Sequence, residues 1–280
     1  MKKGLIPLLV VLSLLRPCAA AAQADAPMED SPPITLESPS CILTEASTGR
    51  VIFEKNADER RPVASVTKIM TILLTLEAID DGRVSENDSV LVSPRASGMG
   101  GSQVFLDANR SYKLSDLLKS VIVASANDAA VALAEHLCGA EEAFVRRMNE
   151  RAAELGLTNT HYVNCTGLPA EGHYTTARDV AHLSAQLDAH PLYYTFSTIW
   201  MDELRHSSGR ITQLTNTNRL VRFYPGCDGY KTGSTNEARY CMSATAKKDG
   251  MRLIAVVLGA PAGQTRVHAV QPLHFSGSIS

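Results

Sequence analysis

The chain is predicted to adopt an α+β fold, in which an antiparallel sheet is flanked by helices and accompanied by a mostly helical subdomain. Strand patterns occupy residues 40–56 and 229–260, and helical patterns fill most of the interval between them. Strands and helices do not alternate, as they would in a doubly wound parallel sheet. The two ends of the chain are therefore expected to assemble one sheet around a helical middle.

The expected elements follow from local patterns, taken in order. Residues 40–46 and 50–56 alternate roughly between apolar and polar side chains around a Ser-Thr-Gly turn, which predicts a β-hairpin. Residues 67–79 form an apolar run of helical length that stops at Asp-Asp-Gly. Residues 83–113 are rich in Ser, Gly and Asn, and are predicted to be mainly loop with short strands.

Four helical patterns and a second group of strands complete the predicted elements. The helical patterns cover residues 114–123, 128–139, 140–157 and 175–189. Thr175 or Thr176 is the expected cap of the last one. Residues 229–235 form a short segment bounded by glycine, which predicts a strand. Two apolar runs flank Lys248-Asp249-Gly250 and predict a second hairpin.

Composition and charge narrow the functional classes. Of the 280 residues, 45% are hydrophobic and 20% are charged, which allows a sizeable core. The formal net charge of −2 gives no electrostatic reason to expect a nucleic-acid partner. The histidines lack metalloprotease spacing and no nucleotide-binding glycine pattern occurs, so neither a metal nor a cofactor is expected.

The N-terminal residues have the pattern of an export signal. Two lysines precede an apolar run over residues 4–15, and small residues follow up to Ala24. Residues 1–24 are therefore predicted to be a signal peptide, and the mature protein to act in the cell wall or periplasmic space. Residues 25–37 are acidic and proline-rich, which predicts a disordered spacer. Cys18 suggests a lipid anchor as an alternative, but Arg and Pro precede it where small residues are needed.

Ser65 and Lys68 stand three residues apart at the head of the apolar run, so their side chains can meet on one helical face. A serine hydroxyl needs an adjacent base to act as a nucleophile. A lysine can be that base when burial or a neighbouring cation removes its proton. The alternative is an ordinary Ser/Lys pair at the protein surface.

Ser125-Ala126-Asn127 interrupts two apolar helical patterns. One interpretation is a turn between helices, with Asn127 or Ser125 as the N-cap. The other is a hydroxyl and an amide directed into an active site, where Ser125 relays a proton and Asn127 orients the substrate.

Lys231-Thr232-Gly233 lies on a predicted strand. Lys231 could bind an anion and lower the pKa of Lys68. Gly233 would let a substrate backbone lie along the strand, as in β-augmentation. The alternative is a solvated lysine beside a turn.

The three motifs occur together in the order found in penicillin-binding proteins and class A β-lactamases. From about residue 39 to 266 the sequence resembles the D-alanyl-D-alanine carboxypeptidases, low-molecular-mass penicillin-binding proteins of peptidase family S11. Four segments show this resemblance: RRPVASVTKIMT, SANDAAVALAE, GLPAEGHYTTARDVA and DGYKTGST. It implies a β-lactamase/transpeptidase-like fold, with residues 38–280 as a serine D,D-peptidase catalytic domain.

The resemblance also implies an activity and partners. The expected reaction removes the terminal D-alanine of peptidoglycan stem peptides through an acyl-enzyme on Ser65, and β-lactam antibiotics would acylate the same serine. The N–H groups of Ser65 and Ser234 would form the oxyanion hole. Lys231, Thr232 and Arg266 would hold the carboxylate of the substrate.

The chain departs from the family pattern in three places. Ala126 and Arg239 stand where members usually have glycine. Members also usually continue into a helix, a β-rich domain and an amphipathic membrane anchor. The sequence after residue 266 has neither the length nor the pattern for these, so reduced stability or an unanchored catalytic domain is expected.

Two other functions remain open. A class A β-lactamase would need a glutamate to activate the deacylating water, and Glu171 lies in the relevant interval, although within a carboxypeptidase-like phrase. A penicillin-sensing or wall-binding module would be acylated without useful turnover. The five cysteines that remain after removal of the signal are expected to be buried free thiols, and a Cys227–Cys241 bridge is the alternative.

Overall fold

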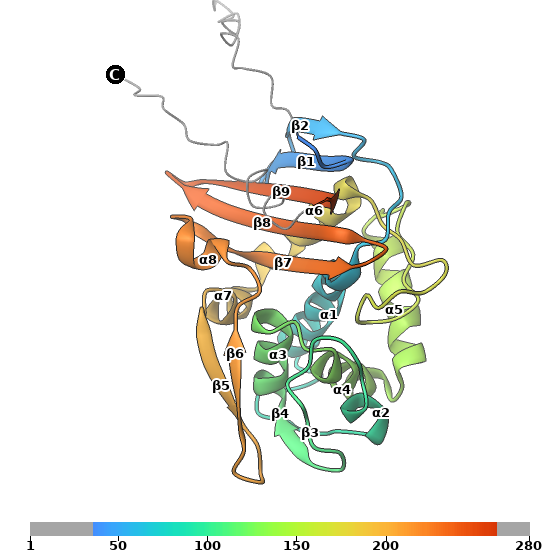
Figure 1. Cartoon of the computed structure of the whole chain (residues 1–280), viewed down its shortest axis with the longest axis vertical. Helices are drawn as coiled ribbons and strands as arrows, with labels where there is room; N and C mark the ends of the chain where they lie inside the picture. Colours follow the sequence, from blue (N-terminus) through green and yellow to red (C-terminus); the bar gives the residue numbers. More distant parts are fainter. Residues whose placement is uncertain (1–35, 262–280) are drawn as a thin grey trace, which may run out of the picture. The chain divides into compact units, whose positions relative to one another are not determined.

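Both ends of the described chain contribute to one five-stranded antiparallel sheet (Figure 1). The computed structural model describes residues 36–261. The strands of the sheet are β1 (Ser40–Glu45), β2 (Val51–Lys55), β7 (Cys227–Thr235), β8 (Arg239–Lys248) and β9 (Met251–Ala260). Their order is β2-β1-β9-β8-β7, and every neighbouring pair is antiparallel. The predicted α+β class and the sheet assembled from both ends are confirmed.

Turn chemistry fixes the β8–β9 hairpin. Lys248 pairs with Met251, so Asp249 and Gly250 alone form the turn. Both have positive φ, 50° and 82°, as a two-residue hairpin turn that matches strand twist requires. At the other edge of the sheet, β7 pairs only with β8, which places the Lys-Thr-Gly motif on an edge strand.

Helix α1 (Lys68–Asp80) is the central core helix. It follows directly on a 3₁₀ turn, η1 (Ala64–Thr67), and is buried over nearly its whole length. Ile69, Met70 and Ile72 have no exposed surface, because apolar side chains surround this helix on all sides. The helix predicted for residues 67–79 is confirmed.

The remaining helices pack around α1 or against the sheet. They are α2 (Pro94–Ser97), α3 (Leu114–Val123), α4 (Asn127–Cys138), α5 (Glu141–Glu154), α6 (Ala177–Gln186), η2 (Leu187–Ala189), α7 (Pro191–Ser197) and α8 (Leu220–Phe223). In Figure 1, α1, α3 and α4 lie below the sheet, and contacts between residues place α6 against β9 and β1. Thr176 accepts a hydrogen bond from Asp179 N and so caps α6, as predicted.

Two small ribbons complete the fold, and one of them was not predicted. Strands β3 (Ser89–Leu91) and β4 (Ser111–Lys113) pair within the region expected to be mainly loop. Strands β5 (Met201–Arg205) and β6 (Ile211–Thr215) form a hairpin beside α3 that the sequence patterns did not reveal. Only Leu204 and Leu214 of this hairpin are deeply buried apolar residues, so it lacks the continuous apolar face of the strands in the main sheet.

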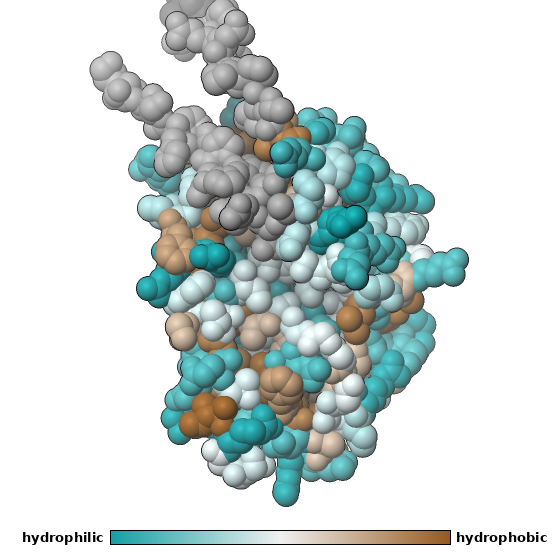
Figure 2. Space-filling view, viewed as in Figure 1, coloured by the Kyte–Doolittle hydropathy of each residue, from teal (hydrophilic) through white to brown (hydrophobic). Residues whose placement is uncertain are grey.

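The surface is predominantly hydrophilic. Figure 2 shows apolar residues singly or in small groups among polar ones on the face that it presents. Within residues 36–261, no helix combines the length and apolarity needed to cross a membrane. All five cysteines in this part of the chain are free thiols, so the alternative Cys227–Cys241 bridge is wrong.

Candidate active site

Ser65 and Lys68 meet where the 3₁₀ turn η1 enters α1. The Lys68 Nζ lies 2.9 Å from Ser65 Oγ and donates to the carbonyl oxygen of Thr166 at 2.7 Å. The tight turn carries Ser65 to the rim of the core, whereas Lys68 is the first residue of a buried helix and has no exposed surface. The predicted contact between the serine and the lysine is therefore present.

The environment of Lys68 disfavours its charged form. Complete burial removes water from the ammonium group, and the charge of Lys231 acts in the same direction, so the pKa of Lys68 lies well below its usual value. A neutral lysine amine can accept a proton from the serine hydroxyl. The burial of Lys68 is thus what would allow its amine to act as a base.

A second Ser/Lys pair lies beside the first. Lys231, on β7, donates to Ser125 Oγ at 3.0 Å, although 106 residues separate them in sequence. Both are almost completely buried. Ser125 has a φ of 62°, an uncommon conformation for a residue with a side chain. The α3–α4 break therefore serves to direct this hydroxyl at the lysine of the sheet edge.

Asn127 is held by the backbone of the preceding loop. Its main-chain N–H donates to Ser102 O at 2.7 Å, and its side-chain Nδ2 donates to Gly100 O at 2.7 Å. The buried Oδ1 has no hydrogen-bond partner among the described residues. This carboxamide oxygen is therefore an acceptor that the described part of the chain leaves unused, although it is buried from solvent.

The alternative interpretation of Ser125-Ala126-Asn127, with Asn127 or Ser125 as the N-cap of α4, is wrong. Ala126 occupies that position and no side chain caps the helix, because Asn127 and Ser125 both make contacts elsewhere. Ala126 has a φ of −62°, which any residue adopts, so the alanine that departs from the family pattern introduces no strain.

Two glycines fix the position of η1. A Cβ added to Gly233 on β7 would lie 2.7 Å from Ser65 N and 2.9 Å from Val63 O. A Cβ added to Gly167 would lie 1.9 Å from Ala64 O. The turn that carries Ser65 is thus enclosed by close backbone contacts on two sides, and only glycine allows each approach.

Gly167 and Thr166 were not predicted as site residues. The only sequence signal for them is the glycine in the segment NCTGLPAEGHY. This glycine by itself does not reveal that its backbone contacts Ala64. The same segment contributes His173, whose Nδ1 accepts from Val163 N and whose Nε2 lies 2.8 Å from Thr67 Oγ1. Because Nδ1 accepts, Nε2 carries the proton and donates to Thr67.

The other predicted residues are distributed as follows. Thr232 is buried on β7 and Ser234 is exposed two positions farther along. Arg239 is exposed with a φ of 56°, the left-handed conformation that suits the glycine usual there. Arg266 lies outside the described residues. Among residues 36–261, no group of three or more His, Cys, Asp or Glu side chains could hold a metal ion.

Comparison with known proteins identifies the family to which this sequence is similar. The family model for D-alanyl-D-alanine carboxypeptidases, peptidase S11, matches residues 25–262. The sequence is 45% identical over 266 residues to the D-alanyl-D-alanine carboxypeptidase DacF of Bacillus subtilis, covering 95% of this chain and 68% of that protein. This chain therefore spans about two thirds of the length of that relative.

Solved structures agree with the sequence comparison. The D-alanyl-D-alanine carboxypeptidase DacD from Francisella tularensis superimposes with a TM-score of 0.83 at 30% identity, over 88% of this chain and 71% of that one. Penicillin binding protein 5 from Haemophilus influenzae superimposes with a TM-score of 0.80 at 32% identity, over 86% and 70% of the two chains. The fold is thus shared with these proteins.

Proposed function

Since this chain belongs to the D-alanyl-D-alanine carboxypeptidases of peptidase family S11, we propose that Ser65 is the nucleophile with which it removes the terminal D-alanine of peptidoglycan pentapeptides. The chain is a serine-type carboxypeptidase and a penicillin-binding protein. Its substrates are peptidoglycan peptides, and it acts outside the cytoplasm. We assign the individual steps of the reaction to residues of this chain as follows.

Acylation begins with Ser65 and Lys68. The hydroxyl oxygen attacks the carbonyl carbon between the two D-alanines, and its proton passes to the neutral amine of Lys68, 2.9 Å away. The N–H groups of Ser65 and Ser234 stabilise the oxyanion that develops. When the C–N bond breaks, Ser125 relays a proton to the leaving amine of D-alanine. Water then hydrolyses the ester and regenerates the Ser65 hydroxyl.

Substrate binding uses the edge of the sheet. The stem peptide lies along β7, whose outer edge has no strand partner within residues 36–261. The unpartnered Oδ1 of Asn127 accepts from a peptide N–H of the substrate. The positive charge of Lys231 and the hydroxyl of Thr232 bind the C-terminal carboxylate, with Arg266 as a further partner. A β-lactam binds in the same place, and its ring amide is opened by Ser65.

The observation that carries this proposal is the fully buried Lys68 in contact with Ser65. The test measures release of D-alanine from diacetyl-Lys-D-Ala-D-Ala by the wild type and by Ser65→Ala. We expect release only from the wild type, and labelling by fluorescent penicillin only where Ser65 is present. Equal release from both proteins would refute the assignment.

The β-lactamase alternative depends on Glu171. This glutamate is exposed on the surface and makes no contact with Ser65 or Lys68 that could direct a water. We therefore expect slow turnover of nitrocefin relative to release of D-alanine. The sensor alternative predicts penicillin labelling without D-alanine release, and the assay above separates it from the carboxypeptidase.

A further inference from the structure

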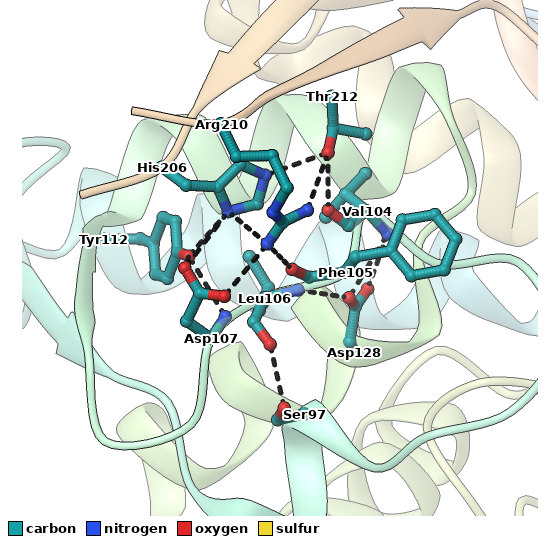
Figure 3. A network of polar contacts seen from close by, with 10 residues as sticks. All are labelled: Ser97, Val104, Phe105, Leu106, Asp107, Tyr112, Asp128, His206, Arg210 and Thr212. Atoms are coloured by element: carbon teal, nitrogen blue, oxygen red, sulfur yellow. Dashed lines mark hydrogen bonds and ion pairs between the residues drawn. The ribbon is translucent and has the colours of Figure 1, made fainter. Parts of the chain in front are cut away.

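The β5–β6 hairpin carries a buried polar cluster that holds the loop preceding β4 (Figure 3). This loop comprises residues 98–110 and is called the 98–110 loop below. His206 has no exposed side-chain surface, and its Nε2 lies 2.9 Å from Thr212 Oγ1. Thr212 donates to the carbonyl oxygen of Val104 at 3.1 Å. Arg210 donates to Phe105 O at 2.5 Å, so two successive carbonyl groups of the loop are bound to the hairpin.

The hydrogen-bond directions in this cluster are determined. The Nδ1 of His206 lies 2.7 Å from Tyr112 Oη and 3.1 Å from Arg210 Nη2. Arg210 can only donate, and Thr212 gives its own proton to Val104 O, so Nδ1 accepts and Nε2 donates. The proton of His206 is therefore on Nε2 and points at Thr212, whose own proton is then directed at Val104 O. The contact between Arg210 and His206 exists only while His206 is neutral, because a protonated Nδ1 cannot accept.

Helix α4 holds the same stretch of loop from the other side. The carboxylate of Asp128 accepts from Val104 N at 3.2 Å and from Leu106 N at 3.0 Å. Between them Phe105 has a φ of 60° and is 58% exposed. A bulky residue keeps a left-handed conformation only where its surroundings impose it, and such outliers concentrate at functional sites. The loop is thus fixed by the hairpin and α4 together.

The fixed stretch lies next to the contacts that hold Asn127. Gly100 and Ser102, whose carbonyl groups orient this residue, are two to four residues before Val104 in the same loop. Asp128 is also the direct neighbour of Asn127 on α4. A shift of residues 104–106 would therefore move both supports of the Asn127 carboxamide.

We propose that the β5–β6 hairpin is a positioning element for acylation, in which Arg210, His206 and Thr212 fix the 98–110 loop and thereby orient the Asn127 amide toward substrate. This inference rests on the proposed role of Asn127 in binding the substrate amide. It makes these three side chains positioning residues, since none of them contacts the reacting atoms. Their effect is transmitted through the backbone of the loop.

The first test replaces Arg210 by methionine, with Arg205→Met as the matched control. Both arginines lie on the hairpin and at its surface, but Arg205 pairs only with Glu203. A displacement of about 1 Å in a site can lower the rate by about 100-fold, so we expect kcat/KM for D-alanine release to fall about tenfold in Arg210→Met. The rate of labelling by fluorescent penicillin should fall similarly, and Arg205→Met should retain both.

The pH profile separates positioning from a simple loss of stability. Burial and the charge of Arg210 lower the pKa of His206, whereas Asp107 and Asp128 oppose them, and Tyr112 Oη contacts Nδ1 at 2.7 Å. Without Arg210, His206 binds a proton more readily. Because Arg210→Met has no Arg210–His206 contact to lose on protonation, the acid limb that His206 contributes to the labelling rate should be absent from this variant. A merely structural role for Arg210 would leave this limb unchanged.

The second test uses a conservative rescue. Thr212→Val removes the hydroxyl and preserves the shape, whereas Thr212→Ser retains the hydroxyl. We expect slower acylation in Thr212→Val and recovery in Thr212→Ser, both measured at 20 °C with melting temperatures recorded in parallel. Wild-type labelling rates and pH profiles in folded Arg210→Met and Thr212→Val would overturn the proposal. Labelling by penicillin needs no turnover, so it tests the positioning role separately from the enzymatic activity. A wild type that is labelled but releases no D-alanine would refute the proposed function and leave the positioning role untouched.

Discussion

The close approach of Gly233 to the turn that carries Ser65 yields a sharp prediction for Gly233→Ala. The added methyl group would lie 2.7 Å from Ser65 N, 2.9 Å from Val63 O and 3.0 Å from Val66 N. All three atoms belong to the backbone, so no side chain can rotate away. Either β7 or η1 has to move.

The size of that movement follows from the distances. Ordinary contacts of a Cβ begin at 3.4 Å, so the closest atom, Ser65 N, must recede by about 0.7 Å. Ser65 N is a proposed oxyanion donor, and loss of one such donor costs about 10²–10³ in rate. We therefore expect acylation to slow about 100-fold. Overpacking should also lower the free energy of unfolding by about 1–3 kcal/mol.

Time-resolved labelling with fluorescent penicillin measures the acylation rate, and urea denaturation measures stability. Gly250→Asn is a suitable control, because position 250 is in the open β8–β9 turn and asparagine tolerates its positive φ. The control should acylate at the wild-type rate. A folded Gly233→Ala protein with wild-type acylation would show that Ser65 N does not bind the oxyanion in its present position.

Three further predictions concern stability and pH. In Lys68→Met, acylation should be lost while the melting temperature rises. The pKa of buried Lys68 lies below its value in the unfolded chain, so unfolding of the wild type takes up a proton and is favoured at low pH. The rise in melting temperature of Lys68→Met over the wild type should therefore be larger at pH 6 than at pH 9. A melting temperature below that of the wild type at both pH values would contradict this. Burial lowers the pKa of His173 to about 4 from an ordinary 6.5, so the wild type should lose about 3 kcal/mol as the pH falls through that interval. Urea unfolding at pH 7.5 and 4.5 should show a smaller loss for His173→Gln, and equal losses would exclude this histidine as the cause. Arg239→Gly should raise the free energy of unfolding by about 1 kcal/mol, because it relieves a left-handed φ. The rate of D-alanine release should remain that of the wild type.

The parts of the fold predicted from sequence are those with strong local patterns. The apolar helix α1 and the two hairpins of the main sheet have the expected boundaries within one or two residues. The region from α7 through α8 was missed, because its strands bury few apolar side chains and depend on polar contacts with distant segments. His206 is an example, since its partner Tyr112 is 94 residues away in sequence.

The site was predictable for a different reason. Each motif is short, and Ser65 and Lys68 are in contact through local helical geometry. The pairing of Ser125 with Lys231 could not follow from spacing, because it depends on the tertiary fold that brings the break between α3 and α4 to β7. The supporting contacts of Gly167 with Ala64 O likewise arise only in three dimensions.

Backbone strain connects these observations. Ala64, Phe105 and Ser125 all have positive φ, and none is a residue that favours that conformation. Each costs about 1–2 kcal/mol relative to a right-handed residue, and each is held by a specific contact. Ala64 packs against a glycine of another loop, and the hydroxyl of Ser125 receives a hydrogen bond from the buried lysine of β7. The carbonyl group of Phe105 is bound by Arg210, and Asp128 binds the N–H groups of the residues on either side of it. Because every support comes from a distant segment, the strain can persist only in the assembled fold, which ties the orientation of the proposed nucleophile, the proposed relay serine and the proposed substrate amide contact to correct packing of the whole domain.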